Sequence, residues 1–144
     1  MNQAPKLLTT ALCLLLLPLP PAGAAELQAF TSDGCSSFPD GTPAQNVLWL
    51  QCCTAHDLAY WKGGTYRERV AADQALRDCV SDVGEPAIAA LMLAGVRVGG
   101  TPFLPTRFRW GYGWPYPRFY AELSEQEVEQ VRRLSPVSQL REDN

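Results

Sequence analysis

The feature that most constrains the fold is a pair of adjacent cysteines, Cys52 and Cys53, in a chain of 144 residues with five cysteines. The other three are Cys13, Cys35 and Cys79. A disulfide between neighbouring residues of a helix is strained, so each member of the pair needs a distant partner of its own. Two such bonds would tie two separate segments to one short stretch of chain.

Residues 1–24 have the pattern of a secretory signal peptide. Lys6 and the amino terminus are basic, residues 7–17 are apolar, and Ala22-Gly23-Ala24 offers a small-residue cleavage site. The apolar run is shorter than the ~20 residues that span a bilayer. We therefore expect a single domain over residues 25–144, secreted or periplasmic, whose four cysteines form two disulfides. An uncleaved N-terminal anchor is the alternative.

Three capping-box patterns mark the starts of helices. With the glycines that follow two of them, they predict helices from residue 42 to 61 or 62, from 65 to 84, and from 124 to 134. Pro86 opens a further helix through Val98 that is apolar nearly all round, and we expect that helix to be buried. The chain is therefore expected to be mainly α.

Two segments are expected to be irregular. Residues 26–41 are rich in turn-forming residues and predict a loop. Residues 101–120 hold four prolines and three arginines among eight aromatic residues, and the prolines exclude a regular helix.

Helix geometry selects among the three ways in which four cysteines can pair. On the predicted first helix, Cys52 and Cys53 project from different faces. In an antiparallel helix hairpin, Cys79 of the next helix lies on the side of Cys52. The predicted bonds are therefore Cys52–Cys79 and Cys35–Cys53.

The only histidine, His56, shares a helix face with Cys52. It lies seven residues before Gly63, and Asp73 lies nine residues after Gly64, so the hairpin brings the two side chains to comparable heights. A carboxylate bonded to one ring nitrogen leaves the other nitrogen free to take a proton from water. Asp78 is the rival partner, although it projects from another face of its helix.

Oxygen ligands for a cation are expected beside His56. A Cys35–Cys53 bond would bring the loop around Cys35 against the face that carries Asp57. Carboxylates and main-chain carbonyls suit Ca²⁺. The candidate ligands are the side chains of Asp57 and Asp33 and the main-chain oxygens of Gly34 and Ser36. A general base beside a cation that stabilises an oxyanion is a hydrolytic arrangement without a serine nucleophile.

The stretch from Cys52 to Tyr60, CCTAHDLAY, followed by Asp73 and Cys79, resembles the secreted phospholipases A2. That family has two adjacent cysteines, then His-Asp, then Cys-Tyr at this spacing, and Ala59 stands where the family has its third cysteine. In the family, the first paired cysteine bonds a cysteine six residues after the distal aspartate, and in this chain Cys79 lies six residues after Asp73. The resemblance covers residues 32–82 and is closest to the compact bacterial and fungal members.

The resemblance implies a role for each matching residue. These roles are base for the attacking water (His56), partner of the base (Asp73), hydrogen-bond donor to that aspartate (Tyr60), main calcium carboxylate (Asp57), carbonyl ligand (Gly34) and side-chain ligand (Asp33). The glycine-rich calcium loop of the animal members is absent, since Ser36, Ser37 and Phe38 stand where glycines would be.

The resemblance implies a secreted, Ca²⁺-dependent phospholipase A2-like hydrolase that cleaves the sn-2 acyl ester of phospholipids at a membrane surface or in micelles. The expected fold is a disulfide-stapled antiparallel helix hairpin with a calcium loop, plus C-terminal helices and an irregular aromatic segment within residues 85–144. The alternative is a catalytically inactive module of the same fold that binds lipid or protein. The net charge of −3 argues against nucleic acid as a partner.

The aromatic segment, residues 101–120, has two interpretations. Trp110, Trp114, Arg107 and Arg109 are candidates for a membrane interface, where aromatic rings lie at headgroup depth and cations meet anionic lipid. The alternative is that this segment packs over the helices of its own domain.

Overall fold

Four helices form the regular structure of residues 25–136, the part of the chain that the computed structural model describes. They are α1 (Leu50–Lys62), α2 (Tyr66–Asp82), α3 (Pro86–Gly99) and α4 (Glu125–Leu134), and this part of the chain contains no strand. The mainly helical fold class is therefore confirmed. The predicted signal peptide, residues 1–24, lies outside the described residues. None of the helices in the described part is long and apolar enough to cross a membrane.

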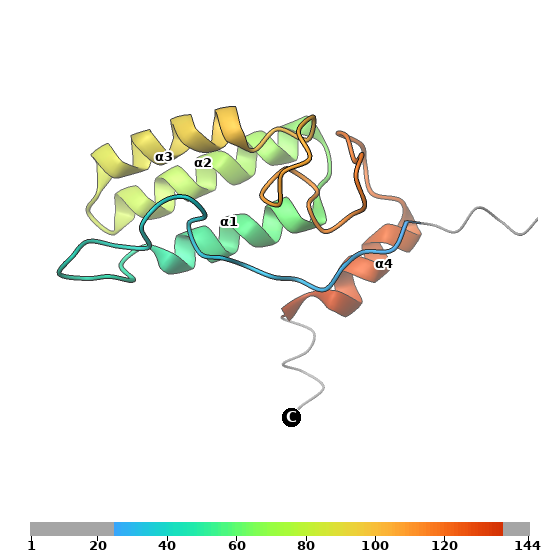
Figure 1. The fold of residues 1–144 in the computed structure, drawn as a ribbon, viewed down its shortest axis with the longest axis horizontal. Coiled ribbons are helices and arrows are strands. Elements are labelled where there is room, and N and C mark those ends of the chain that lie inside the picture. The colour runs from blue at the N-terminus through green and yellow to red at the C-terminus, as the bar shows by residue number, and fades with distance from the viewer. Residues whose placement is uncertain (1–24, 137–144) are drawn as a thin grey trace, which may run out of the picture.

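Three of the helices form one group. α1, α2 and α3 lie side by side, and α4 lies apart from them (Figure 1). The first described residues run along α4, where Leu27 N donates to Gln130 Oε1 at 2.9 Å. The aromatic segment lies beside the C-terminal end of α1 (Figure 1).

α1 begins later than its capping pattern predicts. The local bond does form, because Gln45 N donates to Thr42 Oγ1 at 3.0 Å. However, Trp49 N donates to the carbonyl of Asp40, and the Trp49 indole donates to the carbonyl of Pro39 at 2.6 Å. These contacts bend residues 42–49 into successive turns. The predicted start was wrong because bonds to the preceding loop replace those of a helix.

The other two capping boxes form as predicted. Thr65 Oγ1 accepts from Glu68 N, and Glu68 Oε2 accepts from Thr65 N at 2.7 Å. Ser124 and Glu127 make the same reciprocal pair at the start of α4. Each box satisfies two of the backbone N–H groups that a helix start leaves without partners.

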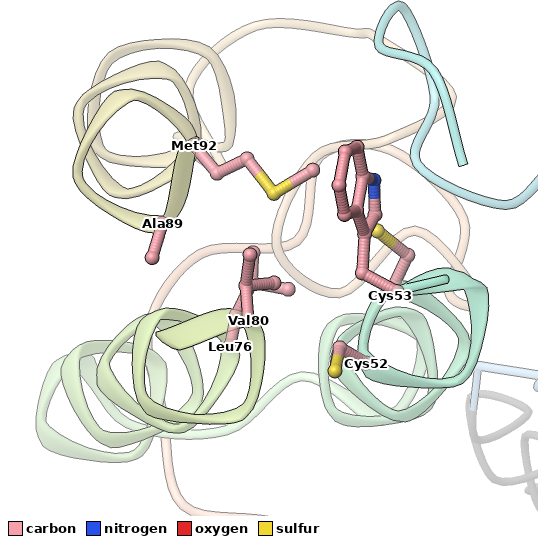
Figure 2. Packing of buried hydrophobic residues seen from close by; sticks show 7 residues of the cluster. Cys52, Cys53, Leu76, Val80, Ala89 and Met92 are labelled. Atoms are coloured by element: carbon pink, nitrogen blue, oxygen red, sulfur yellow. The ribbon is translucent and has the colours of Figure 1, made fainter. Parts of the chain in front are cut away.

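Two apolar clusters stabilise the fold. The first joins the three packed helices, and Figure 2 shows Ala89 of α3 pointing toward α2, which carries Val80, while Met92 reaches from α3 toward α1. The second cluster lies at the C-terminal end of α1 and contains Leu27, Trp61 and Trp114. Trp61 is fully buried there, and its indole donates to the carbonyl of Gln28.

Both predicted disulfides are present. Cys52 of α1 bonds Cys79 of α2, and Cys35 bonds Cys53 of α1. The first bond crosses between two packed helices inside the first apolar cluster. The second ties the loop around Cys35 to the neighbouring face of α1.

The prediction that α3 is buried was wrong. Only Ala89 and Met92 of this helix are buried, whereas Leu91 is 58% exposed and Val98 is 80% exposed. The helix packs on α2 along one stripe, and no other described helix covers its opposite side (Figure 1). Composition alone did not reveal which side of α3 would be covered, because the side that packs on α2 and the opposite side are both apolar.

The aromatic segment is irregular, as predicted, but three of its four interface candidates are buried. Trp110 is fully buried, Trp114 is 1% exposed, and Arg109 is 5% exposed. The two indoles donate to the carbonyls of Gly64 and Lys62 at the end of α1. Packing on the domain's own helices is therefore the correct interpretation for the two tryptophans, and Arg109 is buried within its own segment, where it donates to the carbonyls of Gly111 and Trp114. Of the four candidates, only Arg107 has an exposed side chain.

Candidate active site

Two helices position the candidate catalytic pair. His56 lies one turn after Cys52 on α1, and Asp73 lies on α2, six residues before the cysteine that bonds Cys52. His56 Nε2 is 3.0 Å from Asp73 Oδ1. Asp73 is fully buried, while 8% of the His56 side chain is exposed. The disulfide and the dyad thus hold the same two helices together.

Tyr60 completes a chain of hydrogen bonds whose direction is determined. Arg69 Nε lies 3.1 Å from the Tyr60 hydroxyl, and that hydroxyl lies 2.6 Å from Asp73 Oδ1. A guanidinium can only donate, so the Tyr60 oxygen accepts from Arg69 and its own hydrogen goes to Asp73. Burial and the bond to Asp73 raise the pKa of Tyr60, which keeps it protonated.

The same reasoning assigns the imidazole tautomer. A carboxylate can only accept, so Nε2 of a neutral His56 carries the hydrogen that faces Asp73. Nδ1 is then the unprotonated nitrogen, and it can accept a proton. The His56 and Tyr60 rings pack at 4.2 Å between centroids, which further restricts the imidazole.

Arg97 lies on the far side of Asp73. Its Nε is 2.7 Å from Asp73 Oδ2, at ion-pair distance, although the N–H is not aligned with the oxygen as in a hydrogen bond. The pair brings the last turn of α3 into contact with the dyad.

Asp57 occupies the next face of α1. It is buried, and its Oδ2 accepts from Ser32 Oγ at 2.6 Å. The pKa of Asp57 is raised to about 6, mainly by burial. The bond from Ser32 opposes this increase, and the charge of Asp33 adds to it.

The loop before α1 is held by bonds of its own. Asp33 Oδ1 accepts from Ser36 Oγ at 2.9 Å, and Asp33 Oδ2 lies 3.5 Å from Nη2 of the exposed Arg107. Asp40 Oδ1 accepts from Cys35 N at 2.9 Å. Gly34 has a φ of 75° in the left-handed region, where a side chain would also strike Asp40.

Tyr112 brings the aromatic segment to this side of α1. Its hydroxyl donates to the carbonyl of Thr31 at 2.5 Å. Burial raises the pKa of Tyr112, and the charges of Asp57 and Asp33 raise it further. A tyrosine, a serine, a main-chain carbonyl and two carboxylates therefore lie near one another. Within residues 25–136 no group of three or more His, Cys, Asp and Glu side chains is arranged to hold a metal ion.

The structure separates the other candidates from the dyad. Asp78 accepts from Arg77 and Gln74 on the surface of α2 and makes no bond to His56 among the described contacts. Trp110 and Trp114 donate to carbonyls at the end of α1 and just after it, and Trp110 also packs edge-on against the ring of Tyr60, with 5.0 Å between the centroids. Arg109 donates to the carbonyls of Gly111 and Trp114 within its own segment.

Sequence reasoning missed four residues of this region: Arg69, Arg97, Ser32 and Tyr112. Arg69 precedes Asp73 by four residues, a spacing that places both on one helix face and offered a signal. Arg97 and Tyr112 belong to segments outside the recognised motif, and nothing local to them indicates the site. Only tertiary packing brings these two residues to α1 and α2.

Comparison with known proteins adds no relative to this geometry. The chain matches no protein-family model, no curated protein and no solved structure.

Proposed function

We propose that this protein is a secreted, Ca²⁺-dependent phospholipase A2-like hydrolase, built on an antiparallel helix hairpin with a calcium loop, that cleaves the sn-2 acyl ester of phospholipids. The bond of 3.0 Å between His56 Nε2 and Asp73 Oδ1 carries the proposal. It joins the only histidine to a fully buried carboxylate and leaves Nδ1 as a base. The two disulfides support export to an oxidising compartment.

In this proposal the residues of the chain move one proton. His56 Nδ1 takes a proton from a water molecule, whose oxygen attacks the ester carbonyl carbon. Asp73 stabilises the imidazolium through Nε2, and Tyr60 holds the carboxylate in place. When the tetrahedral intermediate collapses, the imidazolium returns the proton to the leaving alkoxide. No covalent acyl-enzyme is formed.

The residues beside His56 fit a hard cation. Asp57 is buried with a raised pKa, chiefly because burial disfavours its charged form, and a bound cation would offset that cost. The neighbouring oxygens of Ser32 and the main chain belong to the type of ligand that Ca²⁺ prefers. Asp57, Asp33 and the carbonyl of Gly34 would hold the ion. Bound there, Ca²⁺ would stabilise the oxyanion that develops on the ester carbonyl.

The test uses phospholipid vesicles with different acyl chains at sn-1 and sn-2. We expect the mature protein to release the sn-2 fatty acid with Ca²⁺ and to lose this activity with a chelator. His56→Gln should be inactive, whereas Asp78→Asn, a surface control, should match the wild type. Equal release from the wild type, His56→Gln and the chelated sample would reject the proposal.

A second function is favoured by one observation. The Asp33 carboxylate is bonded to Ser36 and lies near Arg107, so it is partly engaged within the protein. A catalytically inactive module that binds lipid or protein would retain the fold and need no cation. Calorimetric titration separates the two functions, since vesicle binding without any heat of Ca²⁺ binding would favour the module.

A further inference from the structure

The side chain of Arg97 contacts the dyad from a helix outside the recognised motif. Asp73 is fully buried, so water cannot solvate its Oδ2. Within residues 25–136, Oδ2 has no hydrogen-bond partner, and the Arg97 guanidinium at 2.7 Å is the cation paired with it. A buried carboxylate oxygen without a counter-charge is strongly unfavourable, so Arg97 has an electrostatic role that an exposed arginine lacks.

Reciprocal bonds anchor Arg97 to α2. Arg97 Nη2 donates to the carbonyl of Val70 at 3.2 Å. In the opposite direction, Arg69 Nη2 donates to the carbonyls of Val96 and Arg97 at 2.8 and 2.9 Å. Because Arg69 also donates to Tyr60, one network links the end of α3 to Tyr60, one of the two donors of Asp73 Oδ1. The last turn of α3 is therefore held in register with the dyad.

We propose that Arg97 is a positioning residue, which fixes the orientation of the Asp73 carboxylate and through it the tautomer of His56. With Oδ2 held by Arg97, Oδ1 remains directed at His56 Nε2 and at Tyr60. Without Arg97 the carboxylate can rotate or take up a proton, and either change weakens the bond that keeps hydrogen on Nε2. The catalytic consequence rests on the proposed function, but the effect on the imidazole does not.

The single histidine makes a direct test possible. In ¹⁵N NMR spectra of the neutral imidazole, a protonated ring nitrogen is clearly separated from a bare one, and His56 is the only residue of the sequence that contributes imidazole signals. We expect the wild type without added metal to show the Nε2–H tautomer. Arg97→Met should give a mixture of tautomers, and Arg97→Lys, which keeps the charge, should lie closer to the wild type. Arg77→Met, which removes an exposed ion pair of α2, is the matched control and should not change the spectrum.

Kinetics and a double-mutant cycle separate positioning from simple stability. Arg97→Met should lower kcat by up to about 10²-fold with little change in KM, because the base is misplaced and substrate binding is intact. In an Asp73→Asn background, Arg97→Met should change neither the tautomer nor kcat further. A folded Arg97→Met protein with the wild-type tautomer would overturn the inference, even if its stability were lower. If the wild type hydrolyses no phospholipid, the proposed function fails while the NMR comparison still decides the role of Arg97.

Discussion

At the scale of single residues, the site depends on one carboxylate with three partners. Asp73 accepts from His56 and Tyr60 through one oxygen and faces Arg97 through the other. Since the group is fully buried, each lost partner leaves a polar atom that water cannot reach. Substitutions around Asp73 are therefore expected to affect stability together with activity.

Tyr60→Phe tests this dependence. The substitution removes the donor to Asp73 and the acceptor for Arg69 Nε, both buried, and should lower the free energy of unfolding by about 1–3 kcal/mol. Urea denaturation measures the loss. Tyr66→Phe, at a tyrosine that is 58% exposed, should stay within about 0.5 kcal/mol of the wild type. Equal losses in the two variants would show that the buried hydroxyl of Tyr60 contributes no more to the free energy of unfolding than the exposed hydroxyl of Tyr66.

At the scale of elements, local signals succeeded where no distant group competed for the same bonds. The capping boxes at Thr65 and Ser124 form as the sequence indicates. The pattern at Thr42 forms its hydrogen bond and yet starts no helix, because Trp49 bonds to Asp40 and Pro39. A cap therefore defines a turn reliably, but tertiary contacts decide whether a helix follows.

Glu68→Gln tests the capping box of α2 through its pH dependence. The backbone bond from Thr65 holds the pKa of Glu68 below its ordinary value of 4.5. The ionised group therefore contributes stability that is fully present above pH 4.5 and is lost as the pH falls through the lowered pKa. Thermal unfolding should show Glu68→Gln to be less stable than the wild type at neutral pH, with the difference vanishing in acid. A difference that is constant with pH would contradict the role of the charge.

α3 gives a matched pair of substitutions on adjacent residues. Met92 is 6% exposed and Leu91 is 58% exposed. Met92→Ala should cost about 2–5 kcal/mol by leaving a cavity between α3 and α2, while Leu91→Ala should change stability by less than about 0.5 kcal/mol. Chemical denaturation of both variants measures the contrast. Similar losses would mean that α3 is covered on both stripes.

At the scale of the whole molecule, segments far apart in sequence close around the end of α1. Trp61 donates to Gln28 near the start of the domain, Trp114 donates to the last residue of α1, and Trp110 donates to Gly64 just after it. The two disulfides tie α1 to α2 and to the loop before α1. α1 is thus held from several directions, which suits a helix that carries a candidate base.

Removing each disulfide separately should distinguish their roles. The bonds close loops with sequence separations of 18 and 27 residues, so a Cys→Ser change at both ends of either bond should cost about 3 kcal/mol. Under the proposed function, only loss of Cys35–Cys53 should also weaken Ca²⁺ binding, because that bond ties the loop of Asp33 to Asp57. Calorimetry on folded variants measures this difference, and equal affinities would argue against a metal site in that loop.

The sequence by itself determined the local features: the helical class, the two capping boxes that formed, the cysteine pairing, and the approach of His56 and Asp73. These features follow from helix periodicity and short spacings, which act within one or two neighbouring helices. Tertiary structure alone decided the late start of α1, the covered stripe of α3, the burial of Trp110 and Trp114, and the place of Arg97 beside Asp73. Each of these depends on which groups from distant segments compete for the same buried space or the same hydrogen bonds.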